Sequence, residues 1–105
     1  MNFKDFDLHA KIAAGIRAAA YTTPTPIQSQ AIPKISQGRD VMGLAQTGTG
    51  KTAAFVLPIL DRLLKTKTRG VRALIVAPTR ELAEQIHQSI RLLGGKTGLQ
   101  STTIF

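Results

Sequence analysis

Eight consecutive residues near the middle of the chain constrain its fold more than any other stretch. They are Ala45, Gln46, Thr47, Gly48, Thr49, Gly50, Lys51 and Thr52. A short apolar segment at 41–44 precedes them, and apolar residues at helical spacing follow them. Gly48 and Gly50 allow a tight turn, because glycine has no Cβ and adopts positive φ easily. A strand, a glycine-rich turn and a helix in this order predict a phosphate-binding loop.

The same residues supply the chemistry that a triphosphate needs. Inward-pointing backbone N–H groups and the N-terminus of the following helix favour phosphate oxygens. Lys51 adds a positive charge for the β- and γ-phosphates, and the Thr52 hydroxyl can ligate Mg²⁺. The general pattern starts with glycine, whereas this chain has Ala45, so a glycine-rich surface turn with an unrelated lysine is the alternative. The motif indicates a nucleoside triphosphate but not what its energy is used for.

Composition narrows the class of protein. The 105 residues are enough for one small domain, and 43% of them are hydrophobic, which is typical of a globular chain. The absence of cysteine excludes a disulfide framework and a thiolate metal site. No run is long enough to span a membrane and no signal-peptide core is present, so we expect a cytoplasmic protein. The net charge of +8 favours a polyanion such as nucleic acid, and a solvated basic surface is the alternative.

Residues 1–37 form an expected helical region. Apolar residues at helical spacing predict a first helix at about 8–20. Thr25 and Gln28 form the pattern of a capping box, with Pro26 at the first helical position. A second short helix is therefore expected from Thr25 to about residue 37.

Residues 38–105 alternate between expected strands and helices. The strands are expected at 40–45, 71–77 and 101–105, and the helices at about 51–65 and 79–93. Such alternation predicts an α/β fold with a parallel sheet flanked by helices. A nucleotide would lie at the carboxyl ends of the strands.

Three segments together resemble the motifs of DEAD-box RNA helicases. Phe3 with residues 21–28 resembles the adenine-reading Q motif, and residues 78–83 resemble motif Ia. Residues 45–52 resemble motif I, in which alanine in the first position is usual. The resemblance implies a P-loop NTPase (RecA-like) fold, here the N-terminal part of the first RecA-like domain, truncated after about three strands. The bacterial RhlE-like branch is the most similar, through residues 38–40 and 52–55.

The resemblance also assigns nucleotide contacts. Gln28 would bind the adenine edge, because an amide offers one donor and one acceptor that match N6–H and N7; its capping role is compatible with this. Phe3 would stack on the base, although a core anchor for the first helix is the alternative. Thr23 would border the base. Family members usually have glycine at the position of Ala20, so the turn there is expected to be altered slightly.

Motif Ia implies contacts with RNA. Thr79 and Arg80 would touch the RNA backbone, since a helix N-terminus offers N–H groups and arginine adds charge and fork geometry. Such phosphate contacts hold RNA without reading its sequence. The alternative is a capped helix in which Arg80 pairs with Glu84.

Several parts that the family uses for hydrolysis do not occur in the sequence. These are the Asp-Glu-Ala-Asp box, the Ser-Ala-Thr motif and the second RecA-like domain with its arginines. We expect a parent ATP-dependent RNA helicase that uses ATP and Mg²⁺, with Lys51 and Thr52 as catalytic residues. The chain alone would bind nucleotide and, weakly, RNA without turnover. A sheet with an unpaired edge also predicts marginal stability or an oligomer. Another P-loop protein, such as a transporter ATPase, would leave the Q motif and motif Ia unexplained.

Overall fold

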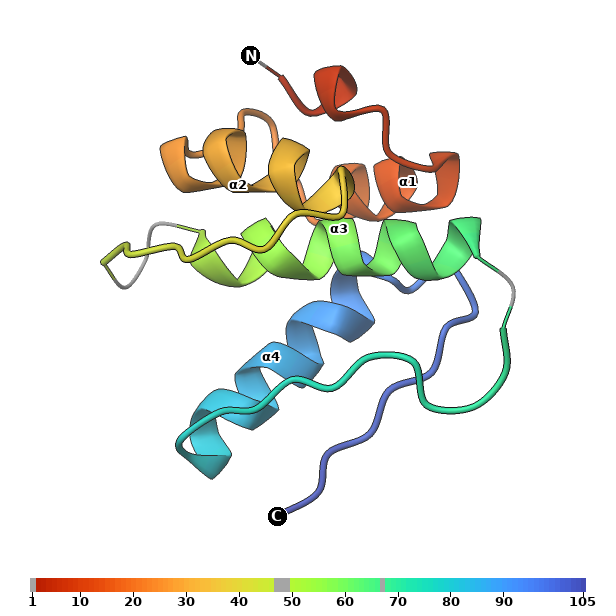
Figure 1. Cartoon of the computed structure of the whole chain (residues 1–105). Coiled ribbons are helices and arrows are strands. Elements are labelled where there is room, and N and C mark those ends of the chain that lie inside the picture. Colours follow the sequence, from red (N-terminus) through yellow and green to blue (C-terminus); the bar gives the residue numbers. More distant parts are fainter. Residues whose placement is uncertain (1, 47–49, 67) are drawn as a thin grey trace.

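The computed structural model describes residues 2–46, 50–66 and 68–105. Their helices are η1 (Phe3–Phe6), a 3-10 helix, and the α-helices α1 (Ala10–Ala18), α2 (Pro26–Ser36), α3 (Lys51–Lys65) and α4 (Arg80–Leu93). Helix α3 lies in the middle and packs against α1, α2 and α4. The N-terminal helices lie on one side of α3, and α4 lies on the other (Figure 1). None of the described helices has the length and apolarity needed to cross a bilayer.

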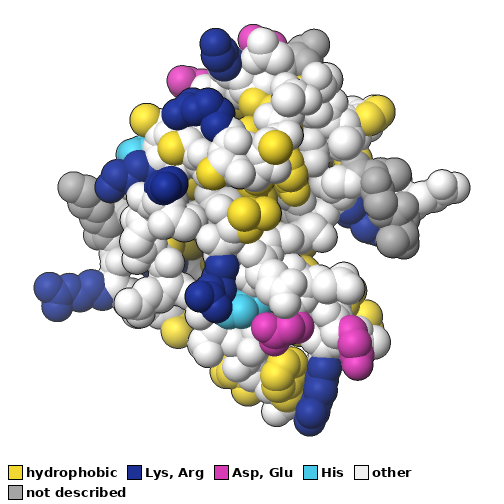
Figure 2. Space-filling model, turned by 180° about the vertical axis from the view of Figure 1, so that it is seen from behind, with side chains coloured by type: hydrophobic (Ala, Val, Ile, Leu, Met, Phe, Trp, Pro, Cys, Tyr) yellow, Lys and Arg dark blue, Asp and Glu magenta, His cyan; other side chains and the backbone are white. Residues whose placement is uncertain are grey.

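Charged side chains are spread over the surface. On the face shown in Figure 2, Lys and Arg occur at separate places, with few acidic side chains between them. The excess positive charge of +8 is therefore not gathered into one patch on this face. The total charge therefore does not by itself mark a polyanion-binding surface on this face.

The strands expected at 40–45, 71–77 and 101–105 are not found among the residues that the structure describes. These segments run as open backbone, and the last two lie on the α4 side of α3 (Figure 1). A parallel strand forms only when a neighbouring strand exchanges N–H and carbonyl groups with it. The backbone hydrogen bonds of the described residues do not join these segments to one another. The parallel sheet is therefore not confirmed, although both helices expected to flank it are formed.

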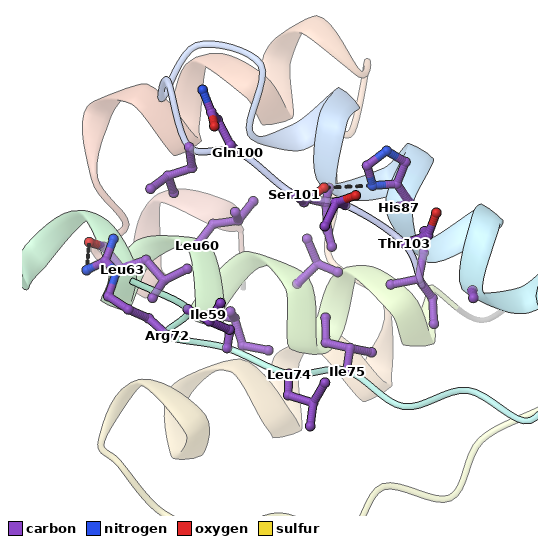
Figure 3. A pocket seen from close by; sticks show the side chains of 18 of the residues that line it. Ile59, Leu60, Leu63, Arg72, Leu74, Ile75, His87, Gln100, Ser101 and Thr103 are labelled. Carbon is purple, nitrogen blue, oxygen red and sulfur yellow. Dashed lines mark hydrogen bonds between the residues drawn. The ribbon is translucent and has the colours of Figure 1, made fainter. Parts of the chain in front are cut away.

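A cavity of about 680 Å³ lies between α3, α4 and the segments 70–77 and 99–104 (Figure 3). Most of the residues that line it are apolar, and they come from both helices and both segments. Arg72 at one end donates from Nη1 to the carbonyls of Leu63, at 3.1 Å, and Thr66, at 2.8 Å. None of the predicted site residues that the structure describes lines this cavity. It lies on the side of the fold where the backbone lacks strand partners.

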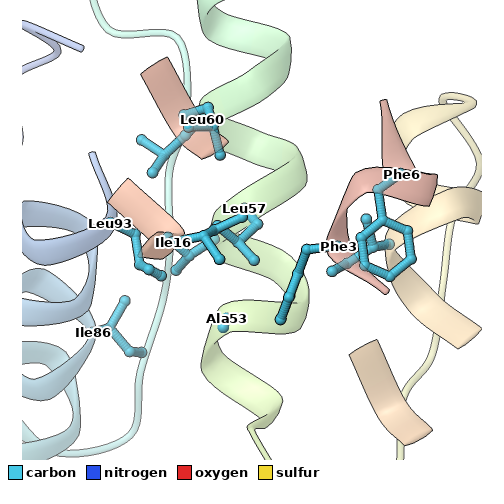
Figure 4. Packing of buried hydrophobic residues seen from close by; sticks show 11 residues of the cluster. Phe3, Phe6, Ile16, Ala53, Leu57, Leu60, Ile86 and Leu93 are labelled. Carbon is cyan, nitrogen blue, oxygen red and sulfur yellow. The ribbon is translucent and has the colours of Figure 1, made fainter. Parts of the chain in front are cut away.

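The core is built around α3. Leu57, at its centre, is 0% exposed and lies in one cluster with residues from η1, α1, α2 and α4 (Figure 4). Phe6 is also buried in this cluster. Helix α1 approaches α4 so closely at Gly15 that a Cβ there would collide with the carbonyl of Leu93. The absence of a side chain at Gly15 therefore permits this helix contact, which the sequence pattern did not reveal.

The N-terminal helices differ from the expected pattern in two ways. The first helix starts at Ala10, with His9 as its N-cap, and ends at Ala18, so it is shorter than the expected 8–20. Asn2 and Asp5 form a capping box around the short helix η1, which was not expected. Ala20 has φ 61°, the left-handed conformation that glycine adopts easily. The structure thus explains why glycine suits this position.

Candidate functional site

The beginnings of α2 and α3 meet at one buried side chain. Gln28 is 3% exposed, and its Nε2 donates to the carbonyl of Gly50 at 3.1 Å. Its Oε1 accepts from the backbone N of Thr25 at 3.0 Å, while the Thr25 hydroxyl accepts from the backbone N of Gln28 at 3.4 Å. The capping box is therefore confirmed. The predicted adenine-reading residue and the last glycine of the phosphate-binding loop are in direct contact.

Gly50 has the backbone that this contact requires. Its φ is 79°, in the left-handed region, and it is the N-cap of α3. A Cβ at Gly50 would collide with the Gln28 amide and lie 3.1 Å from Thr25 side-chain atoms. Any other residue would therefore suffer both backbone strain and a clash. Thr47, Gly48 and Thr49, which we predicted to bind phosphate, lie outside the described residues.

Lys51 and Thr52 open α3. The exposed Lys51 reaches back so that its Nζ donates to the carbonyl of Ala45 at 2.9 Å. The ammonium thus lies between the first residue of the loop and the start of the helix. The hydroxyl of Thr52 is half-buried and makes no hydrogen bond within the described part of the chain. Gln46, beside Ala45, is exposed.

The aromatic residues near this junction form their own contacts. Phe3 is 9% exposed, and its ring centroid lies 5.8 Å from that of Phe6 in an edge-to-face arrangement. Tyr21, to which we assigned no role, lies with its ring centroid 6.3 Å from Phe3 and is 37% exposed. Thr23 is exposed in the loop before α2. Phe3 therefore has the surroundings of a core anchor, and its stacking on adenine stays a prediction.

The start of α4 forms a second candidate site. The Thr79 hydroxyl accepts from the backbone N of Leu82 at 3.1 Å and so caps the helix. The exposed Arg80 places its guanidinium carbon 5.0 Å from the ring centroid of Phe105. Among the described residues the one ion pair joins Lys65 and Asp61, so the alternative pairing of Arg80 with Glu84 is not formed.

The segment after α4 runs back along that helix. Ser101 Oγ lies 2.7 Å from Nδ1 of His87 (Figure 3), and Phe105 lies under Arg80. Neither contact could be predicted from local sequence patterns, because the two residues of each pair lie far apart along the chain. A cation over the face of an aromatic ring is attracted by the ring quadrupole. Phe105 therefore holds the exposed guanidinium of Arg80 near the start of α4.

Comparisons with known proteins agree with these motifs. The family model described as DEAD/DEAH box helicase matches residues 25–105. The ATP-dependent rRNA helicase RRP3 of Lodderomyces elongisporus is 48% identical over 103 residues, which cover 98% of this chain and 20% of that protein. The DEAD-box ATP-dependent RNA helicase RhpA of Helicobacter pylori is 45% identical over 104 residues, with 99% and 21% covered. The chain thus spans about a fifth of the length of these relatives.

Solved structures give the same result. The RNA helicase Prp28 from Chaetomium thermophilum, bound to ADP, matches with a TM-score of 0.90 and 40% identity over 99% of this chain and 26% of its own. A Dbp5 variant from S. cerevisiae, bound to RNA and ADP BeF3, matches with a TM-score of 0.83 and 33% identity over 92% of this chain and 25% of its own. These relatives do not single out the RhlE-like branch, which stays a prediction. The chain belongs to the DEAD/DEAH box helicase family and corresponds to the N-terminal region of its first RecA-like domain.

Proposed function

We propose that this chain is the ATP-binding N-terminal part of an ATP-dependent RNA helicase, which couples hydrolysis to local unwinding of RNA duplexes. The observation that carries the proposal is the hydrogen bond from Gln28 Nε2 to the Gly50 carbonyl at 3.1 Å. It joins the residue proposed to read adenine to the loop proposed to hold the triphosphate. Relatives named as ATP-dependent RNA helicases and a structural neighbour bound to ADP support the same function.

The phosphates would be held by the loop and the start of α3. Backbone N–H groups of residues 45–50 and the helix N-terminus would meet the phosphate oxygens. Lys51 would exchange the Ala45 carbonyl, now 2.9 Å from its Nζ, for the β- and γ-phosphates. Both partners are oxygen acceptors, so the lysine needs no new type of contact. Lys51 and Thr52 are the catalytic residues of this proposal.

The residues present fit a magnesium ion that is shared with the nucleotide. The described residues contain no cluster of three His, Cys, Asp or Glu side chains that could hold a metal alone. The Thr52 hydroxyl, without a hydrogen-bond partner among them, is one oxygen ligand, and phosphates and water would supply the others. When bound, Mg²⁺ would offset the negative charge of the β- and γ-phosphates.

The base and the RNA would be held by separate elements. Gln28 retains one amide hydrogen and one lone pair for an adenine edge, beside Phe3 and Thr23, although its 3% exposure requires the surrounding chain to open. Thr79 and Arg80 would bind the RNA backbone through the first turn of α4 and the guanidinium. Neither of these two residues contacts the other site, so base reading and RNA binding can be tested independently.

A second candidate function is nucleotide binding by the chain alone, without turnover. The acidic residues after Lys51 are Asp61, Glu81 and Glu84. Asp61 is buried in an ion pair with Lys65, and the other two lie on α4. No carboxylate follows the loop in a position to hold Mg²⁺ or orient water, which favours this function for the isolated chain.

The rest of the proposal concerns the complete protein. We infer that segments 40–45, 71–77 and 101–105 become strands of a parallel sheet when neighbouring strands are supplied. A second RecA-like domain would complete the ATPase, and the protein would act in the cytoplasm. The chain alone is inferred to be marginally stable or to associate, because apolar side chains such as Val71 and Ile104 are 93% and 90% exposed.

Titration calorimetry with MgADP and MgGDP tests this function on the chain itself. We expect MgADP to bind more tightly than MgGDP. Lys51→Ala should lower the affinity for MgADP by roughly tenfold or more, as expected for the loss of a charge-assisted hydrogen bond. Lys34→Ala is the matched control, because Lys34 is exposed on α2 and has no side-chain partner among the described residues. Equal binding of the two nucleotides, or unchanged binding by Lys51→Ala, would overturn the proposal.

A further inference from the structure

Two polar side chains are buried among the described residues, and they lie toward opposite ends of α3. Gln28 is 3% exposed and contacts Gly50 at the start of the helix. Asp61 is 4% exposed and lies near the end of the helix. Each connects an N-terminal segment to α3. Gln28 is part of the proposed site, whereas nothing in the proposed function uses Asp61.

Asp61 holds the beginning of α1. Its Oδ1 accepts from the backbone N of His9 at 2.6 Å, across 52 positions of sequence. His9 is the N-cap of α1, and its own Nδ1 accepts from the backbone N of Lys11 at 3.0 Å. A buried carboxylate that accepts a backbone N–H forms a strong, charge-assisted hydrogen bond. The first turn of α1 is therefore fixed relative to α3.

Lys65 completes the connection. Its Nζ lies 2.9 Å from Oδ2 of Asp61 and donates to the carbonyl of Asp7 at 3.2 Å. Asp7 has φ 55° and is the C-cap of η1. The carboxylate is thus compensated on both oxygens, which is what allows it to be buried. Together these contacts hold residues 7–9, the whole link between η1 and α1, against the last turns of α3.

Phe3 lies in η1, the short helix that ends at this link. Phe3 also lies in the same buried cluster as Ala53, which follows Gly50 by three residues. We propose that Asp61 is a positioning residue for nucleotide binding: by holding residues 7–9 on α3 it fixes η1, and with it Phe3, near the Gln28–Gly50 junction. The proposal rests on the proposed function. Asp61 would therefore affect how the base is bound. It would not affect the phosphates, which would be held by the loop and the start of α3.

The test compares a ligand that has a base with one that has none. Affinities of the chain for MgADP and for magnesium tripolyphosphate are measured with wild type, Asp61→Asn and Lys65→Gln. Asp61→Asn keeps the shape and an acceptor oxygen but removes the charge that strengthens the His9 hydrogen bond and attracts Lys65. We therefore expect the affinity for MgADP to fall on the order of tenfold. Lys65→Gln should weaken it about threefold, because its side chain is 51% exposed. The affinity for magnesium tripolyphosphate should change by less than about twofold in both variants, because the phosphate-binding loop is left intact.

Controls separate the possible failures. Glu84→Gln removes one negative charge from α4 without breaking a contact among the described residues, and should bind both ligands like wild type. Hydrogen exchange at the His9 amide should accelerate in Asp61→Asn. Equal losses for the two ligands, or no loss of MgADP affinity, would overturn the proposal; if Asp61→Asn does not fold, Lys65→Gln decides alone. A wild-type chain that does not bind MgADP would instead overturn the proposed function, and this inference with it.

Discussion

The backbone N–H and carbonyl groups on the two sides of α3 find hydrogen-bond partners in different ways. On the N-terminal side, η1, α1 and α2 bond their own N–H and carbonyl groups, and buried apolar residues join them to α3. On the α4 side, segments 71–77 and 99–105 lack strand partners, and Leu74 and Val76 are 84% and 83% exposed. A helix is complete within itself, whereas a strand needs a neighbour. The half that we propose to bind nucleotide can therefore form without a sheet, whereas the half that we propose to bind RNA depends on strand partners.

A pair of leucine substitutions gives the largest expected effect and tests this comparison directly. Leu57→Ala should lower the free energy of unfolding by about 3 kcal/mol, because Leu57 is 0% exposed at the centre of α3. Leu74→Ala should change it by less than about 0.5 kcal/mol, since Leu74 is 84% exposed. Urea unfolding followed by circular dichroism measures both. Similar losses would show that segment 71–77 is packed in solution and that the two sides do not differ.

Gly15→Ala examines the contact between the two sides. The added Cβ would collide with the Leu93 carbonyl, so we expect a loss of about 2 kcal/mol, typical of overpacking. In an exposed helix the same change would gain about 1 kcal/mol from helix propensity. The sign of the effect is therefore decisive. A gain in the midpoint of urea unfolding would mean that α1 and α4 do not approach each other as described.

Gln28→Ala tests the junction on the side of α3 that we propose to bind nucleotide. It removes the hydrogen bond to Gly50 and the capping-box contact with Thr25. MgADP affinity should fall about tenfold and the preference over MgGDP should narrow, since the amide matches adenine and not guanine. Competition binding with both nucleotides measures this. An unchanged preference would remove Gln28 from base recognition and leave it a structural cap.

Whether a feature could be predicted from the sequence depends on how far apart along the chain its interacting residues lie. The caps at Thr25 and Thr79 were predictable, because their partners lie three residues away. Helix η1 was missed, since four residues are too few for a periodic pattern. The strands were expected from apolar composition, but pairing depends on neighbours that local sequence does not specify. The contact between Asp61 and His9 joins positions 52 residues apart, and neither residue type signals it.

The smallest expected effects come from two residues with left-handed backbone, one on each side. Ala20→Gly should raise the free energy of unfolding by about 1 kcal/mol, because Ala20 has φ 61° and glycine adopts this conformation without the Cβ clash. Gly98→Ala is the opposite change at φ 76°, in the turn that leads to segment 99–105, where a Cβ would meet no atom within 4 Å.

If the two turns were equally rigid, Gly98→Ala should lower the free energy of unfolding by about 1 kcal/mol, the same amount by which Ala20→Gly should raise it. We expect a smaller cost, because no strand ladder fixes the segment after Gly98, and the turn can relax to negative φ when alanine is introduced. Urea unfolding gives the change in the free energy of unfolding for each variant. The ratio of the two changes compares how firmly the backbone is held on the two sides of α3. Equal and opposite changes would contradict the comparison, since they would show that the backbone on the α4 side is fixed as firmly as that around α2.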